Sequence, residues 1–201
     1  MSLPGLEYTM NDLVKVNLAK VFEVAYDESK ADAGRTTERL WRSFASHLRE
    51  AVRTAAEGIR HHLKYQKFNE PELLLNLLSH GPIEKGRDVS DGGAEYYNLA
   101  IDGAGLAVVA DSFAALEQRI EREGRLTWQE MDRLLDSDFQ CEEGTKYRTL
   151  LGRSQRYGQA DSLGRKWALA VRDEFTAAVR GETSADGRYK FIPGFFSWAN
   201  T

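Results

Sequence analysis

The feature of this sequence that most constrains its fold is an apolar stripe through residues 40–63. Its members recur every three or four residues and are Leu40, Phe44, Leu48, Val52, Ala55, Ile59 and Leu63. Because an α-helix has about 3.6 residues per turn, this spacing predicts one helix of roughly seven turns with a single buried face. Thr36 or Thr37 is placed to cap its N-terminus. The charged residues between the stripe positions are expected to form a solvated face.

The same periodicity predicts five further helices, over residues 12–26, 72–78, 95–122, 127–135 and 162–180. Thr9 or Asn11 is expected to cap the first of them. Residues 72–78 are apolar on nearly all sides, which predicts a helix buried on most sides.

The end of the sequence has a different pattern. Tyr189 to Trp198 is aromatic and is interrupted by Pro193-Gly194, which predicts a strand entered through a turn. The fold class is therefore expected to be mostly α with one C-terminal strand. A lone strand leaves backbone groups unpaired, so its partners are expected from outside residues 1–201.

Length and composition exclude several classes of protein. The 201 residues suit a single domain, here taken as residues 1–201, with Met1-Ser2-Leu3 resembling a vector-derived start. A single cysteine, Cys141, excludes an internal disulfide and a site of several thiolates, and favours a reducing, cytoplasmic location. No apolar run approaches the roughly 20 residues of a membrane span. The pI near 5.7 argues against a nucleic-acid partner.

Motif searches give no catalytic or metal site. The run from Gly103 to Val108 lacks the third glycine of a dinucleotide fingerprint, and its small residues favour close helix packing. His61 and His62 are adjacent and point about 100° apart on a helix, which does not suit a shared metal. Acidic neighbours of Cys141 disfavour a reactive thiolate. We therefore expect no cofactor, no metal and no catalytic residue within the chain.

Several segments do match one family in order and spacing. They are Asn17-Leu18-Ala19-Lys20, Ile83-Glu84-Lys85-Gly86-Arg87-Asp88-Val89 with Gly92-Gly93-Ala94, the run from Gly103 to Leu116 with its Ala110-Asp111-Ser112, Arg156-Tyr157-Gly158, and Phe191 to Ser197. Together they resemble glycyl radical enzymes of the pyruvate formate-lyase type. Gln159 and Ala160 depart from the family pattern, which has Asn and Asp there.

The resemblance implies a ten-stranded α/β barrel in which a glycyl radical generates a thiyl radical that abstracts hydrogen from substrate. Neither the Gly-Cys-x-Glu loop nor the Arg-Val-x-Gly loop of that chemistry occurs in the sequence. The chain is therefore interpreted as an inactive internal segment lying between the two loops. Its parent would be an anaerobic lyase or transferase that cleaves a C–C bond of a 2-oxo acid or dehydrates a diol. The implied partners are a small-molecule substrate and a radical-SAM activating enzyme.

By the same analogy, Lys15, Ser197 and Ala199 are candidate substrate-binding residues. Lys15 lies near a position that carries a carboxylate-binding Arg in pyruvate-using relatives; its alternative role is a solvated side chain at a helix start. Alternation places Ser197 and Ala199 with Phe195 on a face suited to a barrel lumen, and Phe196 on a face suited to helix packing. Ser197 and Ala199 could equally fill the barrel interior.

Two other functions stay open on sequence alone. One is a non-catalytic helical interaction module with the same scaffold. The other is a stand-alone enzyme using Glu84, Asp88 or Glu95 as acid–base groups. As an isolated fragment, the chain is expected to expose apolar surface that the rest of the barrel would cover, and this surface is expected to drive homo-oligomer formation.

Overall fold

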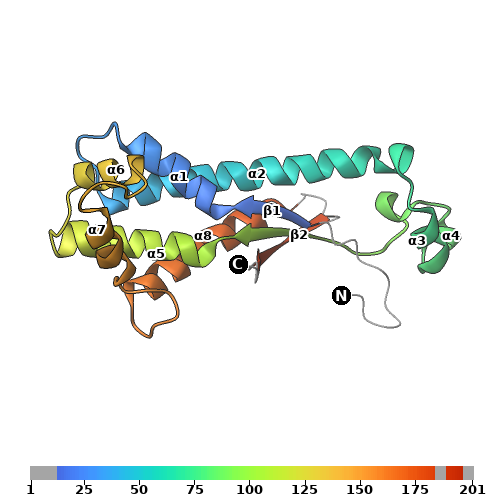
Figure 1. The fold of residues 1–201 in the computed structure, drawn as a ribbon. Helices are drawn as coiled ribbons and strands as arrows, with labels where there is room; N and C mark the ends of the chain where they lie inside the picture. Colours follow the sequence, from blue (N-terminus) through green and yellow to red (C-terminus); the bar gives the residue numbers. More distant parts are fainter. Residues whose placement is uncertain (1–12, 184–188, 197–201) are drawn as a thin grey trace. The chain divides into compact units, whose positions relative to one another are not determined.

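The computed structural model describes residues 13–183 and 189–196 (Figure 1). The chain divides into two compact units. Within the described residues, the sheet unit comprises residues 13–16, 49–103, 175–183 and 189–196, and the helical unit comprises residues 17–48 and 104–174. Helices α2 (Thr37–Asn69) and α8 (Leu163–Gly181) each contribute to both units.

The sheet unit contains three parallel strands where the sequence predicted one. They are β1 (Leu13–Asn17), β2 (Tyr97–Ala104) and β3 (Tyr189–Phe196), with β2 in the middle. The expectation that β3 finds its partner only outside this chain is therefore wrong, because β3 pairs with β2. The β2 residues were assigned to a helix because a short run rich in small apolar residues does not distinguish the two periodicities.

The two faces of the sheet have different surroundings. On one face, the Phe195 ring lies 5.2 Å from that of Phe175 in α8, and the Arg60 guanidinium of α2 lies 5.2 Å from the Phe191 ring. We call the other side of the sheet the second face. By alternation along the strands it carries Lys15, Asn98, Ala100, Asp102, Ile192, Gly194 and Phe196. Ile192 is 44% exposed, so this second face is only partly covered.

The long helix α2 confirms the apolar stripe. Leu40, Phe44, Leu48 and Val52 are completely buried. The helix continues six residues beyond Leu63, to Asn69. The one difference along the stripe is that Ala56 is fully buried and Ala55 only partly.

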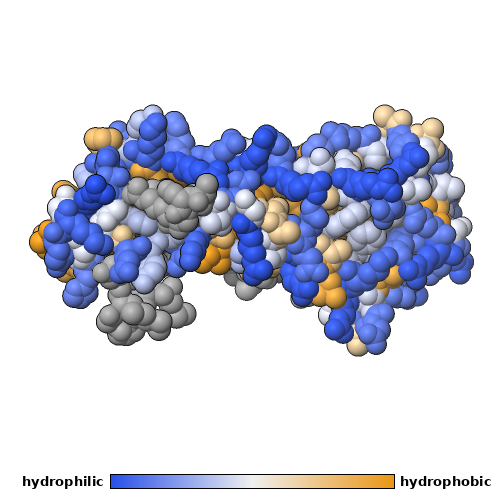
Figure 2. Space-filling view, turned by 180° about the vertical axis from the view of Figure 1, so that it is seen from behind, coloured by the Kyte–Doolittle hydropathy of each residue, from blue (hydrophilic) through white to orange (hydrophobic). Residues whose placement is uncertain are grey.

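Helix α3 (Leu73–Leu78) corrects the prediction of a buried helix. Leu73, Leu74, Leu77 and Leu78 are each 68–79% exposed. Helix α4 (Pro82–Lys85) and the 3₁₀ turn η1 (Val89–Asp91) follow in the same unit, where Leu75 packs against a small cluster of Val89, Ala94 and Tyr97. The view in Figure 2 shows hydrophobic patches on a largely hydrophilic surface. Most apolar side chains of α3 therefore lie at the surface, because only one side of the helix packs against the rest of the unit.

Substituting two of these leucines together, Leu74→Glu and Leu77→Glu, is expected to reduce self-association of the chain. Exposed apolar patches drive association, whereas substitutions at exposed positions change stability by only about 0.5 kcal/mol or less. Sedimentation velocity should show a shift toward monomer with an unchanged urea midpoint. The exposed polar Asn69→Glu on α2 is the control and should leave the oligomer distribution unaltered. A wild-type chain that is already monomeric would contradict the expectation.

The helical unit is built around an aromatic core. Its further helices are α1 (Leu18–Ser29), α5 (Leu106–Leu116), the π-helical continuation η2 (Glu117–Arg122), α6 (Trp128–Asp136) and α7 (Gly144–Gly152). The Phe113 ring stacks on Trp167 at 4.6 Å and meets Phe22 edge-on at 4.9 Å. The capping box of Thr127 and Glu130 is confirmed at the start of α6. Helix α7 was not predicted.

The start of α1 also differs from the prediction. Asn17 caps it, accepting the Lys20 backbone N–H at 3.1 Å, in place of Thr9 or Asn11. The four residues before Asn17 are strand, so the helix begins later than its apolar stripe suggests. Gly103 and Ala104 likewise belong to β2, and Gly105 alone joins the strand to α5 with φ +94°, a conformation that L side chains rarely adopt.

Candidate functional site

The second face of the sheet is the candidate site. Parallel sheets are normally covered on both faces, so a partly covered face is the unusual feature of this sheet. Lys15 lies on β1 rather than at a helix start, which corrects the alternative assigned to it. Its side chain is exposed, and its Nζ lies 4.1 Å from the centroid of the Phe196 ring on β3. Lys15 thus presents a positive charge on this face.

The faces assigned to β3 need correction at two residues. Phe195 packs against α8, although it was assigned to the lumen, and Phe196 shares the second face with Lys15, although it was assigned to helix packing. Side-chain size does not distinguish the two faces of β3, because each face carries a phenylalanine. Ser197 and Ala199 lie outside the described residues, and their roles stay predictions.

Sequence reasoning missed the most unusual group on this face, the Asp102 carboxylate of β2. Asp102 is 9% exposed and forms no hydrogen bond or ion pair with any residue in the described ranges 13–183 and 189–196. Its carboxylate lies against the backbone of Gly194 in the neighbouring strand: a Cβ at Gly194 would lie 2.1 Å from Asp102 Oδ1. The signal available in the sequence was an acidic residue directly after the apolar pair Ala100-Ile101.

The carboxylates of the stand-alone enzyme hypothesis have structural roles or are exposed. Asp88 accepts hydrogen bonds from the Asn76 side chain at 2.6 Å and from the backbone N–H groups of Ser90 and Glu72. Burial opposes ionisation of Asp88, yet these hydrogen bonds lower its pKa. Glu84 accepts the backbone N–H of Gly81 at 2.9 Å, and Glu95 is exposed. The structure does not bring these groups together as an acid–base pair.

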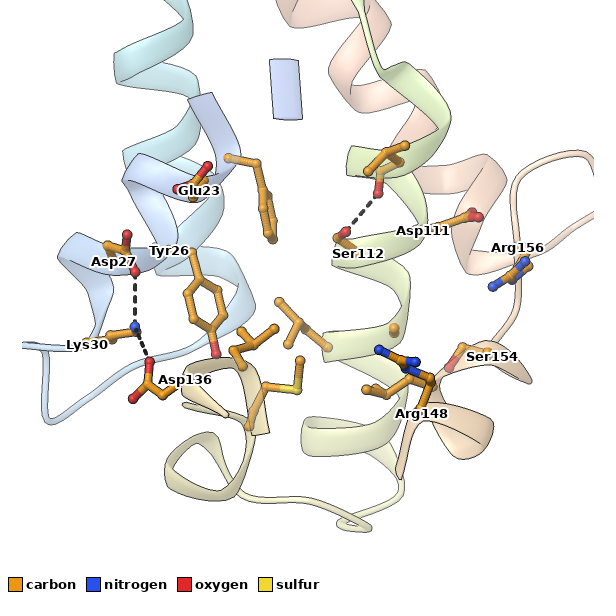
Figure 3. A pocket seen from close by; sticks show the side chains of 18 residues that line it. Glu23, Tyr26, Asp27, Lys30, Asp111, Ser112, Asp136, Arg148, Ser154 and Arg156 are labelled. Carbon is orange, nitrogen blue, oxygen red and sulfur yellow. Dashed lines mark hydrogen bonds and ion pairs between the residues drawn. The ribbon is translucent and has the colours of Figure 1, made fainter. Parts of the chain in front are cut away.

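The helical unit contains a hollow of its own (Figure 3). It has a volume of about 760 Å³ and an apolar lining that includes Phe22, Val108, Leu116, Met131, Leu135 and Leu151. Lys30 at its edge is paired with Asp27 and Asp136, at 3.0 and 3.3 Å. Ser112 donates to the Val108 carbonyl, and Asp111 accepts the Tyr157 N–H. These three polar groups already have partners, and most of the lining is apolar.

The described residues hold neither a metal site nor a membrane span. No group of three or more His, Cys, Asp or Glu side chains is placed to hold a metal ion in that part of the chain. None of its helices has both the length and the apolar character needed to cross a membrane.

The described residues combine helices with a small sheet of three parallel strands, one face of which is only partly covered. The family model described as "Pyruvate formate lyase-like" matches residues 1–201, and the chain belongs to this family. Trans-4-hydroxy-L-proline dehydratase of Clostridioides difficile is 23% identical over 154 residues, covering 76% of this chain and 19% of that protein.

Solved structures agree on the fold. The B12-independent glycerol dehydratase of Clostridium butyricum matches with a TM-score of 0.75 and 19% identity, over 89% of this chain and 24% of that one. A glycyl radical enzyme from Archaeoglobus fulgidus matches with a TM-score of 0.74 and 24% identity, over 90% of this chain and 24% of that one. A protein of 1,2-propanediol dehydration in Roseburia inulinivorans matches with a TM-score of 0.76 and 15% identity, over 90% of this chain and 25% of that one. The chain thus spans about a quarter of the length of these structures, and the barrel is not closed within it.

Proposed function

We propose that this chain is a segment of a glycyl radical dehydratase, to which it contributes three parallel strands and the helices that cover one face of them. The observation that carries the proposal is the second face, a partly covered face of a parallel sheet in a chain of this family. Completing it would require further strands, which fits the larger size of the similar proteins.

Dehydration is favoured over cleavage of a 2-oxo acid. Three of the similar proteins are described by dehydration, of trans-4-hydroxy-L-proline, glycerol or 1,2-propanediol. The carboxylate of Asp102 on the second face also suits a substrate with hydroxyl groups better than one dominated by an anionic oxo acid. The substrate class proposed is a small molecule with at least one hydroxyl group, and activation requires a radical-SAM enzyme acting on the complete polypeptide.

The radical residues are proposed to lie outside residues 1–201. Cys141, the single cysteine, is exposed and lies between α6 and α7 of the helical unit, away from the strands in sequence. A glycyl radical enzyme needs a cysteine beside its substrate, and this one lies in no motif of that chemistry. The chain alone is therefore expected to be inactive.

Electron paramagnetic resonance tests the proposal. After treatment with a radical-SAM activating enzyme under anaerobic conditions, residues 1–201 should show no glycyl doublet, whereas the complete gene product should show one. The complete product should then dehydrate at least one of the three hydroxylated compounds. A doublet on residues 1–201, or a complete product that acquires none, would overturn the proposal.

The exposed leucines of α3 favour a second candidate, the non-catalytic interaction module. The DNA that flanks the coding sequence discriminates the two. A continuous reading frame with a Gly-Cys-x-Glu loop upstream and an Arg-Val-x-Gly loop downstream supports the dehydratase segment. A frame without either loop supports the module.

A further inference from the structure

We infer that Asp102 is a substrate-contacting residue whose carboxylate accepts a hydrogen bond from a hydroxyl group of the substrate. The inference deepens the proposed function and rests on it, since it needs a complete enzyme in which the second face borders the substrate. It names a residue and a contact that family membership by itself does not assign.

The Asp102 carboxylate lacks the partners that a largely buried ionisable group normally has. The residue is 9% exposed and has no hydrogen-bond partner among the described residues. Its oxygens are not among the fully enclosed unpartnered atoms of this part of the chain, which belong to Arg35, Thr37 and Gln66, so they remain accessible to a ligand. Asp88 in the same unit shows the usual situation, with hydrogen bonds from Asn76, Ser90 and Glu72. The acceptor capacity of Asp102 is thus left for a group that this part of the chain does not supply.

The neighbouring strand also makes room for this carboxylate. Gly194 lies beside Asp102, and any side chain there would collide with Oδ1, since the added Cβ would lie 2.1 Å away. The two residues after Gly194 have contacts of their own, Phe195 with the ring of Phe175 and Phe196 with the Lys15 Nζ. The missing side chain therefore places the carboxylate over β3, on the face that also carries the Lys15 charge.

The chemistry of an ionised carboxylate identifies the class of ligand. It only accepts hydrogen bonds, so its ligand must donate one. A substrate hydroxyl is such a donor, and the similar dehydratases are described by substrates that carry hydroxyl groups. Lys15 lies on the same face and is not required for the contact.

The first test uses the complete, activated enzyme and compares Asp102→Ala and Asp102→Asn with wild type. Hydrogen bonds to charged groups are worth enough that Asp102→Ala should lower kcat/KM by about 10- to 100-fold. Asp102→Asn keeps an acceptor oxygen and should lose less. Exposed Glu57→Gln on α2 is the control, with unchanged kcat/KM.

A second readout separates substrate contact from a structural role. The readout is the affinity for the substrate compared with the affinity for analogues that each lack one hydroxyl group. The wild-type enzyme should bind the substrate more tightly than each analogue. In Asp102→Ala, most of this difference should disappear for the analogue that lacks one particular hydroxyl. All variants must first give a wild-type glycyl doublet. A wild-type enzyme without a doublet defeats the proposed function, whereas a normal doublet with unchanged kcat/KM and unchanged hydroxyl discrimination in Asp102→Ala defeats this inference alone.

The packing of Gly194 can be tested in residues 1–201 themselves. Gly194→Ala should lower the urea midpoint in the wild-type background, and adding Asp102→Ala should restore most of the loss, because the colliding oxygen is gone. Equal losses in both backgrounds would show that the carboxylate does not lie over Gly194, which would overturn the geometry on which the inference stands.

Discussion

Replacing Asp132 with alanine is expected to lower the free energy of unfolding of the chain by about 3–5 kcal/mol, the usual cost of breaking a buried ion pair from one side. The Asp132 carboxylate accepts two hydrogen bonds from Arg35 Nη1, at 2.8 and 3.0 Å, and one from the Tyr26 hydroxyl at 2.8 Å. The Arg35 guanidinium lies 4.1 Å from the Tyr26 ring and 4.4 Å from that of Trp128, and its side chain is only 5% exposed. Without Asp132 that charge would remain buried and uncompensated.

A matched control lies four residues along the same helix. Asp136 pairs with Lys30 at 3.3 Å, but its side chain is 68% exposed, so Asp136→Ala should cost about 1 kcal/mol or less. Urea denaturation followed by circular dichroism measures both variants. Equal losses for the two aspartates would contradict the buried role of the Arg35–Asp132 pair.

The same network makes the chain sensitive to high pH. Burial, together with the hydrogen bond to Asp132, raises the pKa of Tyr26 well above its ordinary value near 10. A raised pKa in the folded state means that the stabilisation is present below about pH 10 and is lost as the pH rises beyond it. Tyr26→Phe should flatten this part of the stability curve, and an unchanged alkaline slope in that variant would contradict the assignment.

Replacing Glu117 with alanine is the second large effect, with an expected loss of about 3 kcal/mol. Glu117 begins the π-helical segment η2 and is 8% exposed. Its carboxylate accepts hydrogen bonds from Trp167 Nε1 at 2.7 Å, from Lys166 Nζ at 3.0 Å and from Arg122 Nε at 3.0 Å. Its removal leaves the buried Trp167 N–H without an acceptor and two cations without their common partner.

Glu117→Gln should lose less stability than Glu117→Ala, because its amide oxygen can still accept a hydrogen bond from Trp167 Nε1. Glu142→Ala, at an exposed position before α7, is the control and should change stability by no more than about 0.5 kcal/mol. Thermal and urea unfolding measure the series. A loss of the same size in Glu142→Ala would show that the effect is not specific to this site.

Glu117 also predicts a loss of stability in acid. Burial by itself would raise its pKa, but the hydrogen bonds from Lys166, Arg122 and Trp167 lower it below the ordinary value. The stabilisation is therefore present above about pH 4.3 and disappears as the pH falls below it. In Glu117→Gln, this acid-dependent part of the unfolding free energy should be missing.

Long, regular elements were predictable because their information is local. The stripe along α2, the capping box of α6 and the extent of α8 all follow from spacing within one segment. The family was also recognisable, because its motifs are short runs in a fixed order, and residues 1–201 match it. Segments with mixed signals were assigned wrongly. The residues of β1 were joined to the following helix, and those of β2 were taken for helix.

The candidate site was only partly predictable. Lys15 was singled out and lies on the second face, but Asp102 and Gly194 were missed. The local sequence around Asp102 and Gly194 does not predict their contact, because the two residues are 92 positions apart. Pairing of β2 with β3 is what brings them together.

The sequence by itself determined the long helices, the capping box of α6, the absence of both radical loops from residues 1–201 and the family, because each of these depends on residues close together along the chain. Only the tertiary structure decided which face of the sheet is covered, that the α3 leucines lie at the surface, and that Asp102 lies buried against Gly194. These features depend on which distant segments meet, and the free energy of that packing is not contained in any one segment.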